Sequence, residues 1–256
     1  MRKFLPILAL LFLATTCHAG HTVLQQNNCI GPRPGTIYQA PCPFGVANLA
    51  GDGIVAITIG SGIQYPSCGV SDSNGNTYVS AGQLLGPAST SQVTMQVAFN
   101  IFAGANTVTS TCNSFDYASI YIFEVQGALG QPNLIDQVSG GTCTACHTQS
   151  TGSITTTVSN EIIFVAAFEF QNFSEVFATG WSDSAGWLNP LTHNDSQDGT
   201  TGLSSHTVNM IVSSTGSYAD NVSFTGGPAS PNLVTMIASF SFGSATSTLV
   251  HRRQIY

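Results

Sequence analysis

The chain has 256 residues, of which 43% are hydrophobic and 7% charged, with 5 Lys and Arg against 12 Asp and Glu. This length suits one large all-β domain or two small ones. Nucleic-acid binding needs clustered Lys and Arg to displace counterions, so the composition disfavours nucleic acid and, for the same reason, anionic membranes.

Residues 1–19 have the pattern of a secretory signal peptide. Two basic residues precede an apolar run at 5–14, and Cys17 and Ala19 place small residues before a cleavage point. A retained membrane anchor is the alternative, which the shortness of the run disfavours; lipidation at Cys17 fits its preceding residues poorly. We expect a protein that is secreted, periplasmic or on the cell surface. Cleavage would leave three arginines against twelve acids, a net charge of −9, and no lysine.

Six cysteines follow the leader, and an even number in an exported chain indicates disulfides. Six cysteines allow fifteen connectivities. Pairing between nearest neighbours is the prediction: Cys29–Cys42, Cys68–Cys112 and Cys143–Cys146.

Beyond the leader, the chain divides into three parts. Residues 20–50 are rich in Gly, Pro and Asn and are predicted to be an irregular segment stapled by its disulfide. Residues 51–243 form the folded domain, and 244–256 read as a polar tail. Strands are predicted at 53–59, 93–99, 107–111, 117–125, 153–158, 161–170, 204–213, 217–224 and 233–242, and residues 70–78 are predicted to form a strand, a turn and the start of a second strand.

The strand predictions rest on periodicity and on turn residues. Apolar and polar residues alternate over 93–99, the period of a half-buried strand, whereas 117–125 is almost wholly apolar, as in a strand covered on both faces. Asn74-Gly75 predicts a hairpin turn. No stretch has helical periodicity. The expected fold is therefore all-β, a two-sheet antiparallel sandwich of jelly-roll or immunoglobulin-like kind.

A weak echo links residues 106–123 with 216–240, since both hold a Thr- or Ser-rich strand followed by an apolar strand. By itself it is too loose to establish a duplication.

Six turn-and-strand motifs lie between residues 50 and 242: DSNGNTY at 72–78, NI at 100–101, GANTV at 104–108, IFEVQG at 122–127, EIIF at 161–164 and VSSTGSY at 212–218. They resemble motifs of a family of exported bacterial β-sandwich domains. The resemblance implies the architecture and export, but the family is largely uncharacterised and transfers no catalytic residue. This chain departs from it in its cysteines.

The sharpest chemical motif is Cys143-Thr144-Ala145-Cys146-His147, because C-x-x-C-H is the attachment signature of c-type haem. Both thiols would join the haem vinyl groups and His147 would ligate the iron. We favour a local disulfide on a Gly-rich loop; zinc would need further ligands. Under the haem alternative, the second axial ligand would come from Met95, Met210, Met236, His193 or His206.

Acidic residues suggest two further sites. Glu124 and Glu169 lie on apolar strands, and paired carboxylates on a concave sheet would make a jelly-roll glycoside hydrolase; rim acids bonded to turn amides are the alternative. Asp195 and Asp198 lie in a loop that could hold Ca²⁺, although a solvated turn explains it as well. No other cofactor or metal is expected.

The strongest binding candidate is the aromatic segment 170–199. Sugar rings present apolar C–H faces and a hydroxyl rim, which suit aromatic rings beside amide and carboxylate groups. The same rings could instead plug the end of the sandwich. The sequence therefore favours a non-enzymatic protein that acts in adhesion, in binding of a glycan or cell-surface polymer, or in surface structure. Its candidate ligand-binding residues are Phe170, Phe173, Phe177, Trp181, Trp187 and His193.

Overall fold

The computed structural model describes residues 20–31, 37–87, 91–127, 131–172, 177–195, 201–227, 229 and 231–243. The predicted leader and the predicted polar tail lie outside these ranges. All pairings between the described strands are antiparallel, and the described residues form no α-helix. The predicted all-β sandwich is confirmed.

The first half of the chain builds one sheet, with the order β1-β6-β3-β5-β4 and with β2 also paired to β6. Its long central strands, β3 and β6, pair along almost their whole length. The strands are β1 (Thr22–Ile30), β2 (Ile37–Pro43), β3 (Gly53–Asp72), β4 (Tyr78–Leu85), β5 (Ser91–Phe99) and β6 (Thr107–Gln126).

The second half builds the other sheet, with the order β11-β12-β10-β15-β7. Four short strands pair as β13 with β9 and β14 with β8. The main strands are β7 (Leu134–Thr144), β10 (Glu161–Asn172), β11 (Leu188–Asp195), β12 (Thr201–Val212) and β15 (Asn232–Ser241). The short strands are β8 (Thr148–Ser150), β9 (Ile154–Thr155), β13 (Ser217–Tyr218) and β14 (Asn221–Ser223).

Alternate residues of the central strands fill the core between the two sheets. Tyr121 and Phe123 of β6 point into this core together with Phe164 and Phe168 of β10. The Phe123 and Phe164 rings lie 4.8 Å apart. Because side chains alternate along a strand, the residues between them face outward. Ile122 belongs to a separate apolar cluster on the outer face.

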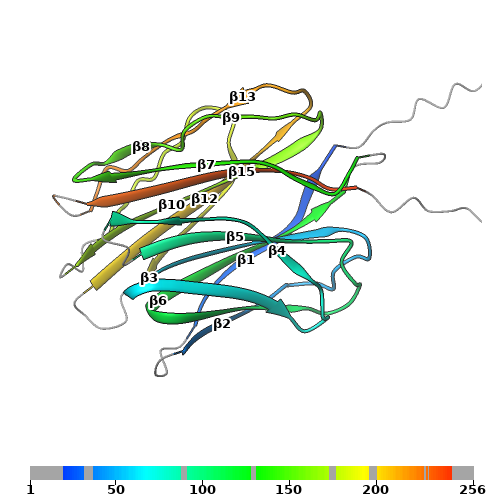
Figure 1. Cartoon of the computed structure of the whole chain (residues 1–256), viewed down its shortest axis with the longest axis horizontal. Coiled ribbons are helices and arrows are strands. Elements are labelled where there is room, and N and C mark those ends of the chain that lie inside the picture. The colour runs from blue at the N-terminus through cyan, green and yellow to red at the C-terminus, as the bar shows by residue number, and fades with distance from the viewer. Residues whose placement is uncertain are drawn as a thin grey trace, which may run out of the picture.

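Each sheet is also covered on its outer face, so the molecule has four layers (Figure 1). β3 and β6 pair as a long two-stranded ribbon with register shifts near Gly62. Beyond these shifts, the part of the ribbon formed by residues 67–72 and 108–113 packs with β2 on the outer face of the first sheet. The Thr58 and Ser110 hydroxyls meet there at 2.8 Å. The four short strands cover the second sheet in the same way. This double covering explains why the central strands are apolar on both faces.

Several segments differ from the prediction. β4 covers residues 78–85, beyond the predicted strand that ends at Tyr78, and the strands predicted at 107–111 and 117–125 are one continuous strand, β6. Residues 20–50, expected to be irregular, contain β1 and β2, and the Gly-rich connection after residue 131 contains β7. β11 also lies where no strand periodicity was found. β1, β7 and β11 are largely half-exposed and polar, so their conformation comes from pairing with β6, β15 and β12 rather than from an apolar pattern. β2 differs, because it buries Tyr38, Ala40 and Cys42 on one face.

The two sheets have the same topology. The first sheet has the order β1-β6-β3-β5-β4, and the second, taken from its other edge, has the order β7-β15-β10-β12-β11. In both, the strands follow one another in the same sequence order. Thus β1, β3, β4, β5 and β6 correspond to β7, β10, β11, β12 and β15. Hydrogen bonds repeat as well: Phe44 N donates to Asn106 O at 3.0 Å, and Thr151 N donates to Asp220 O at 2.9 Å. The described part of the chain therefore contains an internal structural repeat, with one copy in each half.

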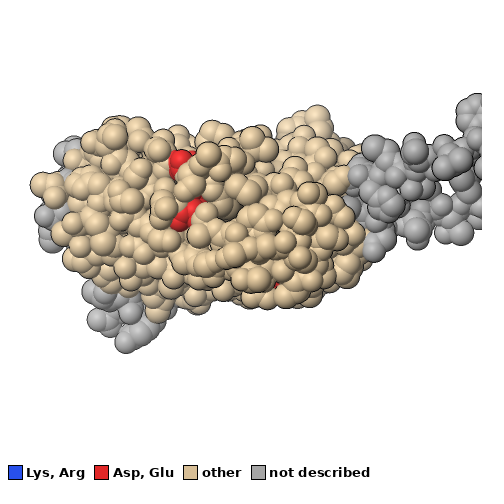
Figure 2. All heavy atoms as spheres, turned by 90° about the horizontal axis from the view of Figure 1, so that it is seen from above, with Lys and Arg blue, Asp and Glu red and all other residues tan. Residues whose placement is uncertain are grey.

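The surface of the described body is almost free of charge. All five Lys and Arg residues lie outside the described ranges. Several carboxylates are buried, among them Asp52, Glu124, Glu161, Glu169 and Asp220. Figure 2 accordingly shows a face of uncharged residues with small acidic spots.

Candidate functional groove

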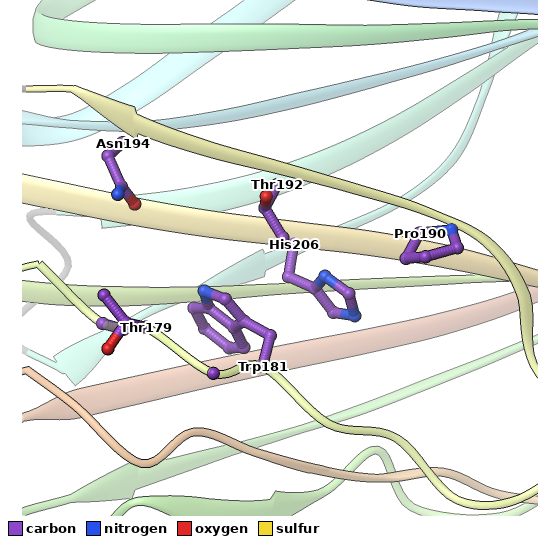
Figure 3. Close-up of a pocket in the computed structure, with 8 residues that line it drawn as sticks. Thr179, Trp181, Pro190, Thr192, Asn194 and His206 are labelled. Carbon is purple, nitrogen blue, oxygen red and sulfur yellow. The ribbon is translucent and has the colours of Figure 1, made fainter.

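A groove of about 290 Å³ lies on the outer face of the second sheet, at its β11 edge. One wall is β11, the other is the segment 178–181, and β12 lies between them (Figure 3). We call this hollow the Trp181 groove. It is lined by Ala178, Thr179, Gly180, Trp181, Pro190, Thr192, Asn194 and His206.

Strand geometry explains the β11 wall. Pro190, Thr192 and Asn194 are spaced by two, so they project on the same side of the strand. Leu191, between them, packs against the inner core. Because β11 is an edge strand, Pro190 leaves no ladder hydrogen bond unmade and blunts the edge against pairing with another strand.

The opposite wall is held by β14 and the residues after it. Ser182 and Ser223 form an antiparallel bridge, with hydrogen bonds of 2.8 and 2.9 Å, and Thr225 N donates to Thr179 O at 3.0 Å. Gly180 has φ +60°, and a Cβ there would lie 2.3 Å from the Thr225 hydroxyl oxygen. A glycine is therefore required at this bend.

The Ser204 hydroxyl joins the two walls from below. It accepts a hydrogen bond from Trp181 Nε1 at 3.2 Å and lies 2.7 Å from Asn194 Oδ1 and 3.1 Å from the Ala178 carbonyl oxygen. Ser204 is fully buried. The width of the groove thus depends on one small side chain.

We expect Ser204→Ala to lower the free energy of unfolding by about 1 kcal/mol, because it removes the hydroxyl that accepts from the half-buried indole N–H and bonds to the opposite wall. Urea denaturation followed by Trp fluorescence measures this loss. Ser217→Ala is the control, because the Ser217 hydroxyl is exposed where it meets Ser153. Equal stability of the Ser204 variant and the wild type would contradict the bridging role.

His206 forms the floor. Its ring lies parallel to the Trp181 indole, with centroids 5.4 Å apart and an interplanar angle of 10°. Its Nε2 atom lies 2.9 and 3.1 Å from the two Asp183 carboxylate oxygens. The His206 side chain is 2% exposed and that of Asp183 13%. Nδ1 of His206 has no hydrogen-bond partner. The floor therefore contains a buried polar atom without a hydrogen-bond partner.

A second carboxylate lies behind this pair. Asp220 is buried and accepts a hydrogen bond from Ser184 N at 2.8 Å. Burial, together with the nearby Asp183 carboxylate, raises the pKa of Asp220 to about 6. The cluster therefore carries less negative charge in mildly acidic solution than two free aspartates would.

Of the predicted binding residues, the groove contains Trp181. Phe170 lies in the inner core, and Trp187 packs against the outer apolar cluster. His193 is half-buried, which lowers its pKa, and it does not line the groove. Phe177, also half-buried, is not among the lining residues either, and Phe173 lies outside the described residues.

Five of the groove residues are not predicted as binding residues by the sequence: Thr179, Pro190, Thr192, Asn194 and His206. The signal for part of this set is the alternation in residues 190–194, PLTHN, once a strand is assumed there.

All three predicted disulfides are present, Cys29–Cys42, Cys68–Cys112 and Cys143–Cys146. They place the folded chain in an oxidising compartment such as the extracellular space or the periplasm. In the C-x-x-C-H motif both thiols are consumed by the disulfide, so they are not free to join haem vinyl groups. His147 lies against Phe224, with ring centroids 5.0 Å apart.

The proposed carboxylate pair is not brought together. Glu124 lies next to Val125 and Phe123, which face the inner core, so it points to the outer side of the first sheet. Glu169, between Phe168 and Phe170, points to the outer side of the second sheet. The two sheets and their core separate these acids, and they cannot flank a single glycosidic bond.

The calcium candidate is not described: Asp198 and the side chain of Asp195 lie outside the described residues. Among the side chains that are described, no group of three or more His, Cys, Asp or Glu is placed to hold a metal ion.

A scan against models of protein families, a search of curated proteins and a search of solved structures each found no match to this chain. The described ranges contain no helix long and apolar enough to cross a membrane. Functional inference therefore rests on the groove itself.

Proposed function

We propose that this is an exported, non-enzymatic glycan-binding protein and that the Trp181 groove is its binding site. The observation that carries the proposal is the chemistry of the lining. Hydroxyl and amide groups of Thr179, Thr192 and Asn194 surround the apolar surfaces of Trp181 and Pro190. A sugar offers the complementary arrangement, hydroxyl groups around apolar C–H faces.

The size of the groove supports the same ligand class. A hollow of about 290 Å³ lies at the small end of the range of ligand sites. His206 and Phe224 already pack on the indole of Trp181, with centroids 5.4 and 5.1 Å away. The ligand would therefore meet the part of the indole that these rings leave uncovered, together with Pro190. The role is binding rather than hydrolysis, because Glu124 and Glu169 face opposite sides.

The test is a substitution that fills the groove without disturbing the fold. Thr192→Tyr puts a ring into the hollow from an exposed position on an edge strand, where Tyr is a good strand former. We expect it to weaken retention on immobilised neutral polysaccharides by about tenfold or more. Thr142→Tyr, exposed on the other edge strand β7, is the matched control and should bind like the wild type. Equal binding by both variants, or no retention of the wild type, would refute the proposal.

A further inference from the structure

The internal repeat places two copies of one turn at equivalent positions. Residues 71–75 read SDSNG and residues 182–186 read SDSAG. The glycine of each copy has positive φ, 74° at Gly75 and 103° at Gly186. The serine after each aspartate accepts the same backbone bond: Thr107 N donates to Ser73 Oγ at 3.0 Å, and Asn221 N to Ser184 Oγ at 3.1 Å.

In the first copy the aspartate is closed off by its own turn. Asp72 accepts hydrogen bonds from Asn74 N at 3.1 Å, Asn76 N at 3.0 Å and Asn76 Nδ2 at 2.7 Å. Tyr78 Oη and Asn106 Nδ2 donate to it at 3.0 and 3.1 Å. This copy has the character of a structural turn.

The space beside the first copy is also filled. Gln96 of β5 accepts a hydrogen bond from Val70 N at 3.1 Å and donates to Cys68 O at 2.9 Å. Gln92 lies four residues before Gln96, on the same face of β5. Its side chain lies 3.1 Å from Cys68 Sγ and also bonds to Gln83 of β4. Two long amide side chains thus join β5 both to the overlying ribbon and to β4.

The second copy has lost these features. Trp187 and Asn189 stand four and six residues after Asp183, where the first copy has Asn76 and Tyr78. Asp183 bonds instead to His206 of β12. On the outer face, β12 presents Ser204 and His206 in place of the long amide side chains of β5. The Trp181 groove therefore lies where one copy of a closed structural unit has opened.

We propose that this opened copy binds an extended, uncharged glycan chain that lies along β11, rather than a single terminal sugar. This inference rests on the proposed function and specifies its ligand. The side chains of Pro190, Thr192 and Asn194 span about 13 Å at a rise of about 3.3 Å per residue, a length that exceeds one sugar ring. Their spacing of two residues repeats polar contacts along the wall.

Charge supports the neutral class. The described body has no Lys or Arg that could pair with a uronate or sulfate. The ionisable side chain nearest the floor that reaches solvent is Asp183, at 13% exposure. An acidic sugar would lose water without gaining a counter-charge, and it would meet a like charge.

Titration calorimetry of the full chain tests this. The probes are neutral gluco-, xylo- and manno-oligosaccharides of one to six units, with oligogalacturonate of the same lengths as the acidic set. We expect affinity for one neutral series to rise about tenfold from one unit to four, and oligogalacturonate to bind about tenfold more weakly. Asp183→Asn keeps a hydrogen-bond partner for His206 but removes the charge, and it should narrow the gap between neutral and acidic chains about threefold.

The outcomes separate the two proposals. If a single sugar binds as tightly as four, or oligogalacturonate as tightly as the neutral chains, and Thr192→Tyr still blocks binding, the extended neutral ligand is wrong while the glycan site stands. If no probe binds in a way that depends on Thr192, both proposals fall. Thr142→Tyr again serves as the control for folding.

Discussion

The protein is expected to be most stable in mildly acidic solution and to lose stability as the pH rises from about 4 to about 8. Burial raises the pKa of Glu169 to about 8. Burial, with the neighbouring Asp136 carboxylate, does the same for Glu161. Burial raises the pKa of Asp52 and of Asp220 to about 6, with further contributions from Glu124 and Asp183 respectively.

The sign follows from proton binding. Between pH 4 and 8 the folded state keeps protons on these carboxyls that the unfolded chain has released, so the free energy of unfolding falls as pH rises. Their contribution is complete below the unfolded pKa values. Two histidines oppose the trend, since burial lowers the pKa of His21 and of His193. The carboxyl shifts to about 8 outweigh them. Burial raises the pKa of Asp72, but hydrogen bonds from Asn76, Asn106 and Tyr78 outweigh it and lower the pKa, so its stabilisation is lost in stronger acid.

Glu169→Gln isolates one contribution. Glu169 is 1% exposed, and neither carboxylate oxygen has a hydrogen-bond partner. We expect the variant to match the wild type near pH 4 and to exceed its unfolding free energy at pH 8 by on the order of 3 kcal/mol. Urea denaturation at both pH values measures this.

Glu161→Gln provides a second, separate probe. It lies eight residues away on β10, about 26 Å along the strand, so the two effects should add. A wild type that is more stable at pH 8 than at pH 5, with both variants unchanged, would contradict the burial of neutral carboxyls.

Strands that are buried on a whole face were predictable from the sequence, whereas most exposed edge strands were not. Alternation and apolar runs found β5 and β10 nearly to their ends, because both are buried on at least one whole face. β1, β4, β7 and β11 were missed because edge strands with half-exposed residues carry little period-two signal. β2 was missed although it buries Tyr38, Ala40 and Cys42, because Pro41 and Pro43 within it are typical of turns and loops. Their strand character is set by long-range pairing, which no local pattern records.

The groove was only partly predictable for a related reason. Phe170 and Trp181 look alike in sequence, but the strand phase turns Phe170 into the core, whereas Trp181 lies on the segment over the outer face. Which aromatic ring reaches the surface depends on the phase of a strand whose end the sequence did not fix. The internal repeat also has a sequence signal that is clearer than the echo between 106–123 and 216–240. Residues 71–75, SDSNG, and residues 182–186, SDSAG, are identical at four of five positions. The opened copy is the second one, SDSAG, beside the Trp181 groove.

Removal of the Cys68–Cys112 disulfide should have the largest effect on stability of any single cross-link. It closes a loop of 44 residues, and loss of that constraint on the unfolded chain is worth about 4 kcal/mol. The bond also lies where the β3–β6 ribbon packs over the first sheet, and Cys112 is fully buried in that layer. The test is Cys68→Ala with Cys112→Ala, which leaves no free thiol.

Cys143→Ala with Cys146→Ala is the matched control. Its cysteines are three residues apart, with Cys143 in β7 and Cys146 in the turn before β8, so the same treatment gives about 2 kcal/mol or less. Urea denaturation of both variants at pH 5 should therefore rank the Cys68–Cys112 pair well above the other. Binding should survive in the folded Cys68–Cys112 variant, because that bond belongs to the first half of the repeat and the Trp181 groove to the second. Equal losses from the two variants would mean that loop closure does not govern how these cross-links stabilise the sandwich.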